Sequence, residues 1–403
     1  MSERRQAVID LGSNSFRLVV FTWHEDGTAS WWKRTDEIHE AVRVGAGLDA
    51  THALQDEPME RALRMLELYA HFCRATGITD VRPVATSAIR DASNQAEFLE
   101  AARRRTWLEV RVLDREEEAR YGYLAAVNST TLADGVALDI GGGSMQLTRV
   151  EGRLPMQTRS WRMGAVRMTE RFLEGKRTSP KQIKALRAHV EKKLDAAGWV
   201  AGAGGIDGRL VGVGGAVRNL ASAAQLAAGK PLFTVQGVTV TRDQLQELID
   251  RFVELPAADR GEVDGVKAGR ADVILASAVV IDTVMEIGGF DAIEATEAGL
   301  REGVFFETLL EGAEPPLFDD VRRASVLNLA AQYHPEYAHT EHVAALSLEM
   351  WDALAESKRH PGNPAERELL WAAAMLHDIG TAVDYDDHHK HSRYLVLNAG
   401  LPG

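Results

Sequence analysis

Cysteine is almost absent from this 403-residue sequence, in which Cys73 is the single example. One thiol excludes a disulfide framework and a zinc site built from cysteines. Long apolar runs are missing as well, since none approaches the roughly 18 residues that a membrane-spanning helix needs. The opening MSERRQAVID has no apolar signal segment. We therefore expect a cytoplasmic protein with no membrane span.

Positive charge is also in short supply. Lys and Arg total 46 against 59 Asp and Glu, which gives a formal net charge of −13. Sequence-independent binding of duplex nucleic acid needs a broad basic surface, so this partner is not expected. A local basic groove for a smaller polyanion remains compatible with the composition. The length is sufficient for two or three domains.

Two segments share one pattern, a strand that ends near an Asp, a Gly/Ser turn and a second strand. The first comprises residues 6–10, the turn Gly12-Ser13-Asn14-Ser15 and residues 18–21. The second comprises residues 136–140, the turn Gly141-Gly142-Gly143-Ser144 and residues 145–150. Their aspartates, Asp10 and Asp139, lie 139 − 10 = 129 residues apart. This weak internal repeat predicts a duplicated α/β domain whose turns face each other.

The remaining elements follow from periodicity and from glycine and proline positions. We expect helices at 56–76, 94–105 and 216–227, with strands at 81–85 and 210–213. A third glycine turn, Gly214-Gly215, lies between the last strand and the last helix. After Pro315-Pro316 the pattern becomes helical, from about 321 to 354 and from 365 to 376. This change from α/β to all-α predicts a domain boundary.

Glycine turns after strands present backbone N–H groups to anionic oxygens. The three turns described above therefore predict a shared phosphate site, although each alone is equally a tight loop. None fits the P-loop pattern, because no Lys-Ser or Lys-Thr follows the glycines. Asp10 and Asp139 either hold Mg²⁺ beside the phosphate or cap their turns, and the residues leave both readings open.

Two further features have both a functional and a plain structural reading. Arg90 follows a strand and either binds phosphate through two N–H groups or forms a surface salt bridge. The run DREEEAR from Asp114 to Arg120 opens a helix, where acidic residues favourably meet the helix dipole. One of its three glutamates would alternatively act as a general base for water. The pattern itself does not select which one.

Six segments in order carry a family resemblance: AVIDLGSNSFRLVV, ATSAIRDA, DREEEARYGYL, ALDIGGGSMQL, VGVGGAVRNLA and GLREGV. The tail adds HTEHVAALS, LLWAAAMLHDIG and HHKHSRYLVLN. Together they resemble the exopolyphosphatase / guanosine pentaphosphate phosphohydrolase family over nearly the whole chain.

The resemblance implies an α/β fold of two actin-like (ASKHA, ribonuclease H-like) lobes, at residues 1–123 and 124–314. An all-α, HD-like domain at 315–403, incomplete at its end, would follow. The implied reaction is Mg²⁺-dependent hydrolysis of a terminal phosphoanhydride, from inorganic polyphosphate or from the 5′ end of pppGpp. A homodimer is implied as well.

The same resemblance assigns roles to individual residues. Glu118 matches the catalytic base, Arg90 a phosphate-contacting arginine and Asp139 a metal-associated aspartate, with Asp10 as its counterpart in the first repeat. The phosphate-binding residues would be Gly12, Ser13, Asn14, Ser15, Gly141, Gly142, Gly143, Ser144, Gly214 and Gly215. Such a site works by positioning water and neutralising charge rather than by covalent chemistry.

Gln146 departs from the family pattern. The family usually reads Gly-Gly-Gly-Ser-Thr-Glu where this chain reads Gly-Gly-Gly-Ser-Met-Gln. An uncharged amide replaces a carboxylate in the catalytic region, which would weaken metal binding or turnover. Gln236, where the family often has His, is a second departure. An exopolyphosphatase is therefore our first expectation. A pppGpp 5′-phosphohydrolase and a weakly active polyphosphate or pppGpp sensor are the alternatives, and an actin-fold kinase ranks last.

The tail resembles HD phosphohydrolases, which bind metal through a His, a His-Asp pair and a later Asp. His342 and His377-Asp378 would supply the first three, but no later Asp is suitably placed. We therefore expect a structural or substrate-extending segment, while His388, His389 and His391 would bind a stray transition metal or a polyanion. Candidate basic spots along a polyphosphate path are Arg103-Arg104-Arg105, Arg322-Arg323 and Lys390.

Overall fold

A computed structural model describes residues 3–24, 30–205, 208–333 and 337–403. They form two compact units. The larger contains residues 5–21 and 34–317. The smaller joins residues 318–403 to residues 22–33 and to the first four residues of the chain.

The first sheet holds the first of the repeated hairpins. Its strands are β1 (Glu3–Leu11), β2 (Phe16–His24), β3 (Trp31–Glu40), β4 (Asp80–Ala85) and β5 (Arg111–Val112). They lie in the order β3-β2-β1-β4-β5. The β1–β4 and β4–β5 pairs are parallel. The carboxyl ends of β1 and β4 therefore meet at one edge, and Asp10 pairs in register with Val84 there.

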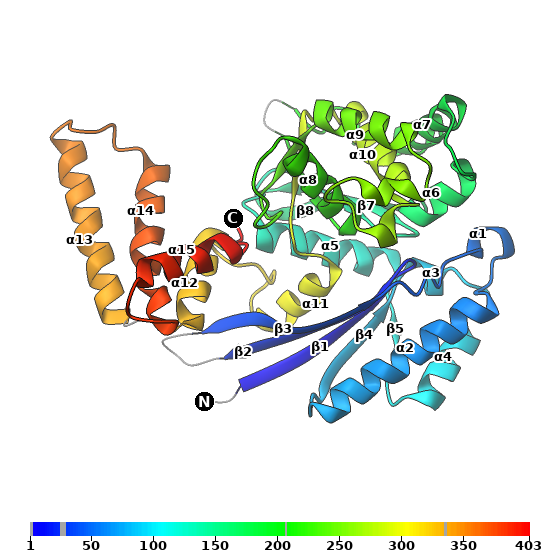
Figure 1. The fold of residues 1–403 in the computed structure, drawn as a ribbon, viewed down its shortest axis with the longest axis horizontal. Coiled ribbons are helices and arrows are strands. Elements are labelled where there is room, and N and C mark those ends of the chain that lie inside the picture. Colours follow the sequence, from blue (N-terminus) through cyan, green and yellow to red (C-terminus); the bar gives the residue numbers. More distant parts are fainter. Residues whose placement is uncertain (1–2, 25–29, 206–207, 334–336) are drawn as a thin grey trace. The chain divides into compact units, whose positions relative to one another are not determined.

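Helices cover one face of this sheet in Figure 1, where α2 and α4 lie together beneath the strands. The helices of this region are α1 (Leu48–Thr51), α2 (Asp56–Ala75), α3 (Ser87–Arg90) and α4 (Gln95–Arg105). Leu63 and Leu66 of α2 and Phe98 of α4 share a buried core with Ile9 of β1. The expected helices and strand in this region are confirmed to within a residue or two.

The second sheet repeats the first. Its strands are β6 (Gly135–Ile140), β7 (Met145–Glu151), β8 (Leu154–Trp161), β9 (Arg209–Val213), β10 (Thr239–Thr241) and β11 (Ala292–Ala295). Their order is β10-β11-β9-β6-β7-β8. The β6–β7 hairpin is antiparallel, and β6 pairs in parallel with β9. In each sheet the first strand of the hairpin also pairs in parallel with a later strand, β1 with β4 and β6 with β9, as the internal repeat predicts.

One almost wholly apolar helix forms the centre of the second lobe. It is α10 (Ile274–Gly288), which is buried along most of its length. Around it lie α6 (Ala165–Phe172), α7 (Pro180–Asp195), α8 (Gly215–Ala227) and α9 (Arg242–Glu254) (Figure 1). Two short 3₁₀ turns, Asp259–Glu262 and Ala268–Arg270, lead into it. The side chains of these helices share one core with the strands of the second sheet.

Two crossing helices join the lobes, α5 (Arg115–Ser129) and α11 (Leu300–Leu309). Gly303 of α11 lies directly against the Tyr121 carbonyl of α5, where a Cβ would collide with the backbone. Phe305 of α11 stacks on Phe21 of β2 with ring centroids 4.2 Å apart. Because α5 also packs on β6, β7 and β9, these helices hold both sheets around one cleft. The larger unit therefore has the expected actin-like fold of two lobes.

The smaller unit is mainly helical, with α12 (Val321–Gln332), α13 (Tyr337–Glu356), α14 (Pro364–Leu376), the 3₁₀ turn Ile379–Ala382 and α15 (His388–Asn398). Leu329, Ala344 and Met375 belong to its core. The single helix expected over 321–354 is instead two helices, and residues 334–336 between them lie outside the described residues. The Trp32 ring stacks on Phe318 with centroids 5.1 Å apart, and the Trp32 backbone N–H donates to Asn328 Oδ1 at 2.8 Å.

The expectation about membranes concerns helix length and polarity. Within the described ranges, no helix is both long and apolar enough to cross a bilayer.

Candidate functional site

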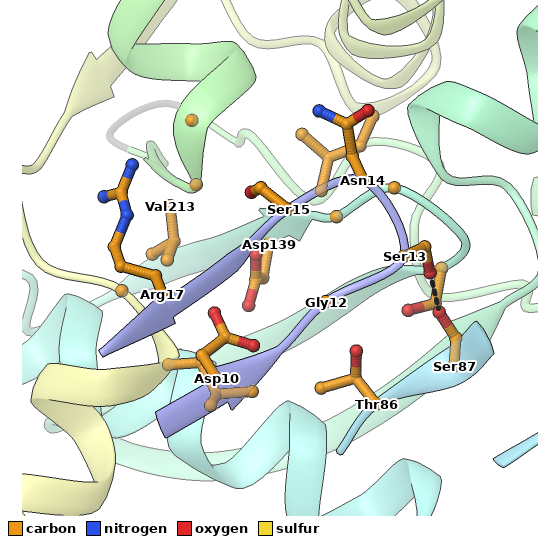
Figure 2. Close-up of a pocket in the computed structure, with 18 of the residues that line it drawn as sticks. Asp10, Gly12, Ser13, Asn14, Ser15, Arg17, Thr86, Ser87, Asp139 and Val213 are labelled. Atoms are coloured by element: carbon orange, nitrogen blue, oxygen red, sulfur yellow. Dashed lines mark hydrogen bonds between the residues drawn. The ribbon is translucent and has the colours of Figure 1, made fainter. Parts of the chain in front are cut away.

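A cavity of about 110 Å³ lies where the strand ends of the two lobes meet. Both repeated turns line it, as Figure 2 shows for the first turn together with Asp10, Asp139 and Thr86. The predicted site residues that line it are Asp10, Gly12, Ser13, Asn14, Ser15, Glu118, Asp139, Gly141, Gly142, Ser144, Gly214 and Gly215. The structure thus brings together residues that are up to 205 positions apart in sequence (215 − 10).

The two repeated turns touch each other directly. A Cβ on Gly143 would lie 2.5 Å from Ser87 Oγ and 2.9 Å from Ser13 Oγ. These two hydroxyls are themselves 3.1 Å apart (Figure 2). Only glycine allows so close an approach, so the glycine run has a packing role as well as a role in exposing N–H groups. Gly143 itself lies behind the cavity wall rather than in its lining.

The third turn closes the site from the second lobe. Gly214 directly follows β9 and has φ of 107°, a conformation that side-chain-bearing residues rarely adopt. It is the N-cap residue of α8. The first turn of this 13-residue helix therefore points its free N–H groups toward the cavity, which favours an anion there.

Asp10 and Asp139 project from β1 and β6 toward the same space (Figure 2). Burial and the charges of Glu118 and Asp10 raise the pKa of Asp139 to about 7, against the pull of Arg218 and Arg301. Burial likewise raises the pKa of Asp10, which Arg301 and Arg17 oppose. Asp139 thus lies in a buried site where the neighbouring carboxyl groups of Glu118 and Asp10 oppose its ionisation.

Glu118 is held at the cavity by contacts to both of its oxygens. It lies in the first turn of α5 and is buried. Arg90 Nη1 donates to Oε2 at 2.6 Å and Ser144 Oγ donates to Oε1 at 2.7 Å. The neighbouring glutamates take other roles, since Glu117 completes a capping box with Asp114 and Glu116 is exposed. The structure therefore singles out Glu118 as the glutamate aimed at the site.

Two expected catalytic residues stand outside the cavity lining. Arg90 binds Glu118 and also donates to the Leu113 carbonyl at 3.0 Å. Gln146 is buried on β7 opposite Asp139, and its Nε2 donates to Ser160 Oγ at 3.3 Å. The Gln146 Oε1 atom is buried without a hydrogen-bond partner among the described residues. Arg90 thus supports Glu118, whereas Gln146 contacts Ser160, which does not line this cavity.

Several of the candidate basic residues pair with acidic residues close by. Arg105 pairs with Glu60 at 2.8 Å. In the smaller unit, Arg322 pairs with Glu368 at 3.1 Å and Lys390 with Asp387 at 2.7 Å. These contacts fit the alternative reading of solvated surface charge.

Four arginines in the cavity received no role from the sequence. They are Arg17, Arg218, Arg270 and Arg301. Burial and the nearby charges of Arg301 and Arg17 lower the pKa of Arg218 to about 9, and burial lowers that of Arg270 to about 10. Because these cations repel one another, a polyanion bound between them would reduce the electrostatic repulsion in the cavity. Three lie within quoted segments, in FRLVV, GGAVRNLA and GLREGV, whereas Arg270 lies in none.

The donor set suits a hard divalent cation. Mg²⁺ prefers carboxylate oxygens and retained water, with phosphate oxygens completing its shell. Asp10 and Asp139 offer two buried carboxyl groups whose pKa values are raised mainly by burial, and neither forms a side-chain hydrogen bond within the described part of the chain. These residues would therefore hold Mg²⁺ beside a bound phosphate.

The fold and cavity together define an actin-like protein of two lobes with a cavity lined by glycine turns, carboxyl groups and arginines. The chain belongs to the Ppx/GppA phosphatase family, whose sequence profile matches residues 32–312. The profile of domain III of that family matches residues 321–403. The family consists of hydrolases, so phosphatase activity follows at this level of description.

Solved structures agree with this placement. The Aquifex aeolicus member of the family is 30% identical with a TM-score of 0.64, and the match covers 77% of this chain and 100% of that one. An exopolyphosphatase-like protein is 28% identical with a TM-score of 0.65, covering 75% and 98%. An exopolyphosphatase from Cytophaga hutchinsonii shares the fold at 21% identity and a TM-score of 0.68, covering 76% and 98%.

Proposed function

We propose that this protein is an exopolyphosphatase, which hydrolyses the terminal phosphoanhydride of inorganic polyphosphate with Mg²⁺. The observation that carries the proposal is the position of Glu118, fixed by Arg90 and Ser144 at a cavity walled by glycine turns and arginines. Relatives described as an exopolyphosphatase and as exopolyphosphatase-like have the same fold.

The geometry supplies each requirement for attack by water. Each Glu118 oxygen keeps a free lone pair beyond the one used by Arg90 or Ser144, so the carboxylate can accept a proton from water. The turn amides and Arg301 hold the phosphate oxygens, and the Nε of Arg301 is buried without a partner among the described residues. Water then adds to phosphorus as the anhydride bond breaks, releasing orthophosphate and a shortened chain.

Mg²⁺, when bound by Asp10 and Asp139, would neutralise charge on the phosphate oxygens. Binding of the ion would also offset the negative charge of these carboxyl groups, whose pKa values are raised first by burial and then by neighbouring acidic groups such as Glu118.

A second cavity, of about 520 Å³, offers room for the rest of a polyphosphate chain. It shares Arg17, Arg218 and Arg270 with the phosphate site and adds Lys267. The same cations thus face both cavities, which suits a substrate with a charge on every unit.

The deciding experiment measures phosphate release from long-chain polyphosphate and from pppGpp, with and without Mg²⁺. Glu118→Gln removes the base but keeps its size, and Glu116→Gln is the matched control on the exposed side of the same helix. We expect loss of at least 100-fold in kcat for Glu118→Gln alone, with binding retained. Undiminished release in Glu118→Gln would place the chemistry elsewhere.

One observation favours pppGpp as a second candidate substrate. Leu232 and Phe233 line the larger cavity, and Phe233 is 51% exposed. An exposed ring beside a phosphate site of this volume suits stacking of a purine base. Phe233→Ala should raise KM for pppGpp several-fold and leave KM for polyphosphate unchanged if a nucleoside binds there. Equal effects on both substrates, or none, would count against a nucleoside site.

The sensor alternative depends on Gln146. Gln146→Glu restores the family carboxylate next to Ser160 and opposite Asp139. A large gain in turnover would mean that the natural chain is a slow enzyme suited to sensing. Unchanged turnover would mean that the site operates with the amide.

A further inference from the structure

A third cavity, of about 300 Å³, lies at α6 and α7 of the second lobe. It shares no lining residue with the phosphate cavity or with the cavity of about 520 Å³. Its wall also includes Ser160 and Trp161 at the end of β8, and Arg115 at the start of α5. Its volume is at the lower end of the range for small-molecule pockets.

Cations outnumber acidic groups in this wall. On α6, Arg167 and Arg171 stand four positions apart and therefore share one face. His189 and Lys193 do the same on α7. Burial lowers the pKa of His189, and neighbouring arginine and lysine charges lower it further. Among the described residues, five cations and one carboxylate line the cavity: Arg115, Arg162, Arg167, Arg171 and Lys193, with Asp49.

Two of these arginines are held in place by carboxylates. Arg167 is buried, and its guanidinium pairs with Asp49 and Asp91, each at 3.2 Å. Arg162 pairs with Asp91 at 3.0 Å. Side chains that are already held lose little freedom when a ligand binds, so this part of the cavity is prepared for binding.

The other three cations lack a carboxylate partner. Arg115, Arg171 and Lys193 are exposed, and none of them forms an ion pair within the described part of the chain. The Ser160 hydroxyl accepts from Gln146 Nε2 at 3.3 Å, which leaves its own proton for a ligand. Unpaired cations and a free donor in one cavity fit an anion with several charged groups.

We propose that this cavity binds an oligophosphate, a chain of two or more phosphate groups, at a site separate from the phosphate cavity. Guanidinium groups match pairs of phosphate oxygens. The cations come from α5, α6, α7 and the segment after β8, so they suit several linked phosphate groups rather than one. The chain is either a free oligophosphate or a distant part of a long polyphosphate substrate, and the second source rests on the proposed function.

The test is a calorimetric titration of the full chain with tripolyphosphate, in chelator and at physiological ionic strength. The double variant Arg171→Met/Lys193→Met removes two exposed cations of the cavity. Lys181→Met/Lys184→Met is the matched control, because it removes two exposed charges of α7 that lie outside the cavity. Arg301→Met weakens the phosphate cavity instead. Thermal unfolding checks that each variant is folded, and Lys193→Met alone replaces the double variant if that does not fold.

We expect two equivalents of tripolyphosphate in the natural chain and in the lysine control. The affinity for one equivalent should fall at least tenfold in Arg171→Met/Lys193→Met. Arg301→Met should weaken the other. A single equivalent that Arg301→Met leaves intact and the double variant removes would support this site, and would count against the phosphate cavity alone.

Two outcomes of the titration would overturn the proposal. One is binding as tight and as stoichiometric in Arg171→Met/Lys193→Met as in the natural chain. The other is an equal loss in the lysine control, because general surface charge would then explain the binding.

Steady-state phosphate release from the same variants distinguishes the two sources of the chain. A higher KM for long-chain polyphosphate, with an unchanged KM for tripolyphosphate, assigns the cavity to a distant part of the substrate. An unchanged KM for both, together with the lost equivalent, assigns it to a free oligophosphate. Equal increases in both would join this cavity to the phosphate site and overturn its separate role.

Discussion

At the scale of single residues, Asp139 is a buried carboxyl group with a strongly raised pKa. Burial and the charges of Glu118 and Asp10 raise its pKa to about 7 from an ordinary 3.8. The folded chain therefore keeps this proton when the unfolded chain has lost it. Between about pH 4 and 7 the unfolded state binds fewer protons, so stability falls as pH rises and levels off above the folded-state pKa.

Asp139→Asn should remove this loss of stability at neutral and higher pH. Without divalent ions, we expect the variant to unfold at a higher temperature than the natural chain at pH 8, and the difference to shrink toward pH 5, where Asp139 is itself neutral. The effect is on the order of a few kcal/mol. Thermal unfolding between pH 5 and 8 in chelator measures it. Asp195→Asn, at the exposed end of α7, is the control. A pH-independent difference would contradict the assigned cause.

Arg90 provides a second test at this scale. It binds Glu118 at 2.6 Å and lies outside the cavity lining, so we assign it to positioning the base. Arg90→Met should lower kcat at least tenfold with little change in KM, measured by steady-state phosphate release. An arginine that contacts substrate would instead raise KM. The resemblance assigned Arg90 to phosphate, and a KM effect would restore that role.

The glutamate that lines the cavity could be singled out from the sequence only through resemblance. Periodicity alone treats Glu116, Glu117 and Glu118 alike, because all three stand in the first turn of one helix. Glu118 differs from the other two because it accepts hydrogen bonds from Arg90 and Ser144, which lie on other parts of the chain. Arg270 illustrates the opposite limit. It reaches the cavity from a 3₁₀ turn in a segment without any local signal, and its position depends on the whole second lobe.

At the scale of elements, the N-terminal cap of α5 affects both the stability of the helix and the position of Glu118. Asp114 caps its first turn by accepting from the Glu116 and Glu117 N–H groups, each at 2.8 Å. That same turn carries Glu118. The β-hairpins and their turns were predictable because alternation and glycine positions are local signals. The break between α12 and α13 was missed, although Pro335 in the segment YHPE is a local signal for the end of a helix.

Asp114→Ala should lower the free energy of unfolding by about 1 kcal/mol, the usual cost of losing a cap. It should also lower kcat, because fraying of the first turn of α5 releases Glu118. Ser179→Ala is the matched control, since it removes an equivalent capping box from α7, which does not line the phosphate cavity. Denaturant unfolding and phosphate release are compared for both variants. Equal activity losses in the two variants would show that α5 has no special role.

At the scale of the whole molecule, charge is distributed unevenly. The chain carries −13 overall, yet the two adjoining cavities gather Arg17, Arg218, Arg270, Arg301 and Lys267. Composition predicted the net negative charge and excluded a broad basic surface. The concentration of cations emerges only when the fold brings residues 17 to 301 to the same cleft.

This arrangement predicts strong dependence on salt. A polyphosphate chain releases bound counterions when it enters the cationic cavities, so KM should rise steeply with KCl while kcat changes less. Lys267→Met removes an exposed cation of the larger cavity. The slope of log KM against log salt concentration should then fall by about one. Lys390→Met, whose lysine already pairs with Asp387 at 2.7 Å, is the control and should leave the slope unchanged. Steady-state release from long-chain polyphosphate at several KCl concentrations gives the slopes.

If Lys390→Met flattened the plot and Lys267→Met did not, the chain of phosphates would run along the helical unit, and the larger cavity would be free for the nucleoside of pppGpp.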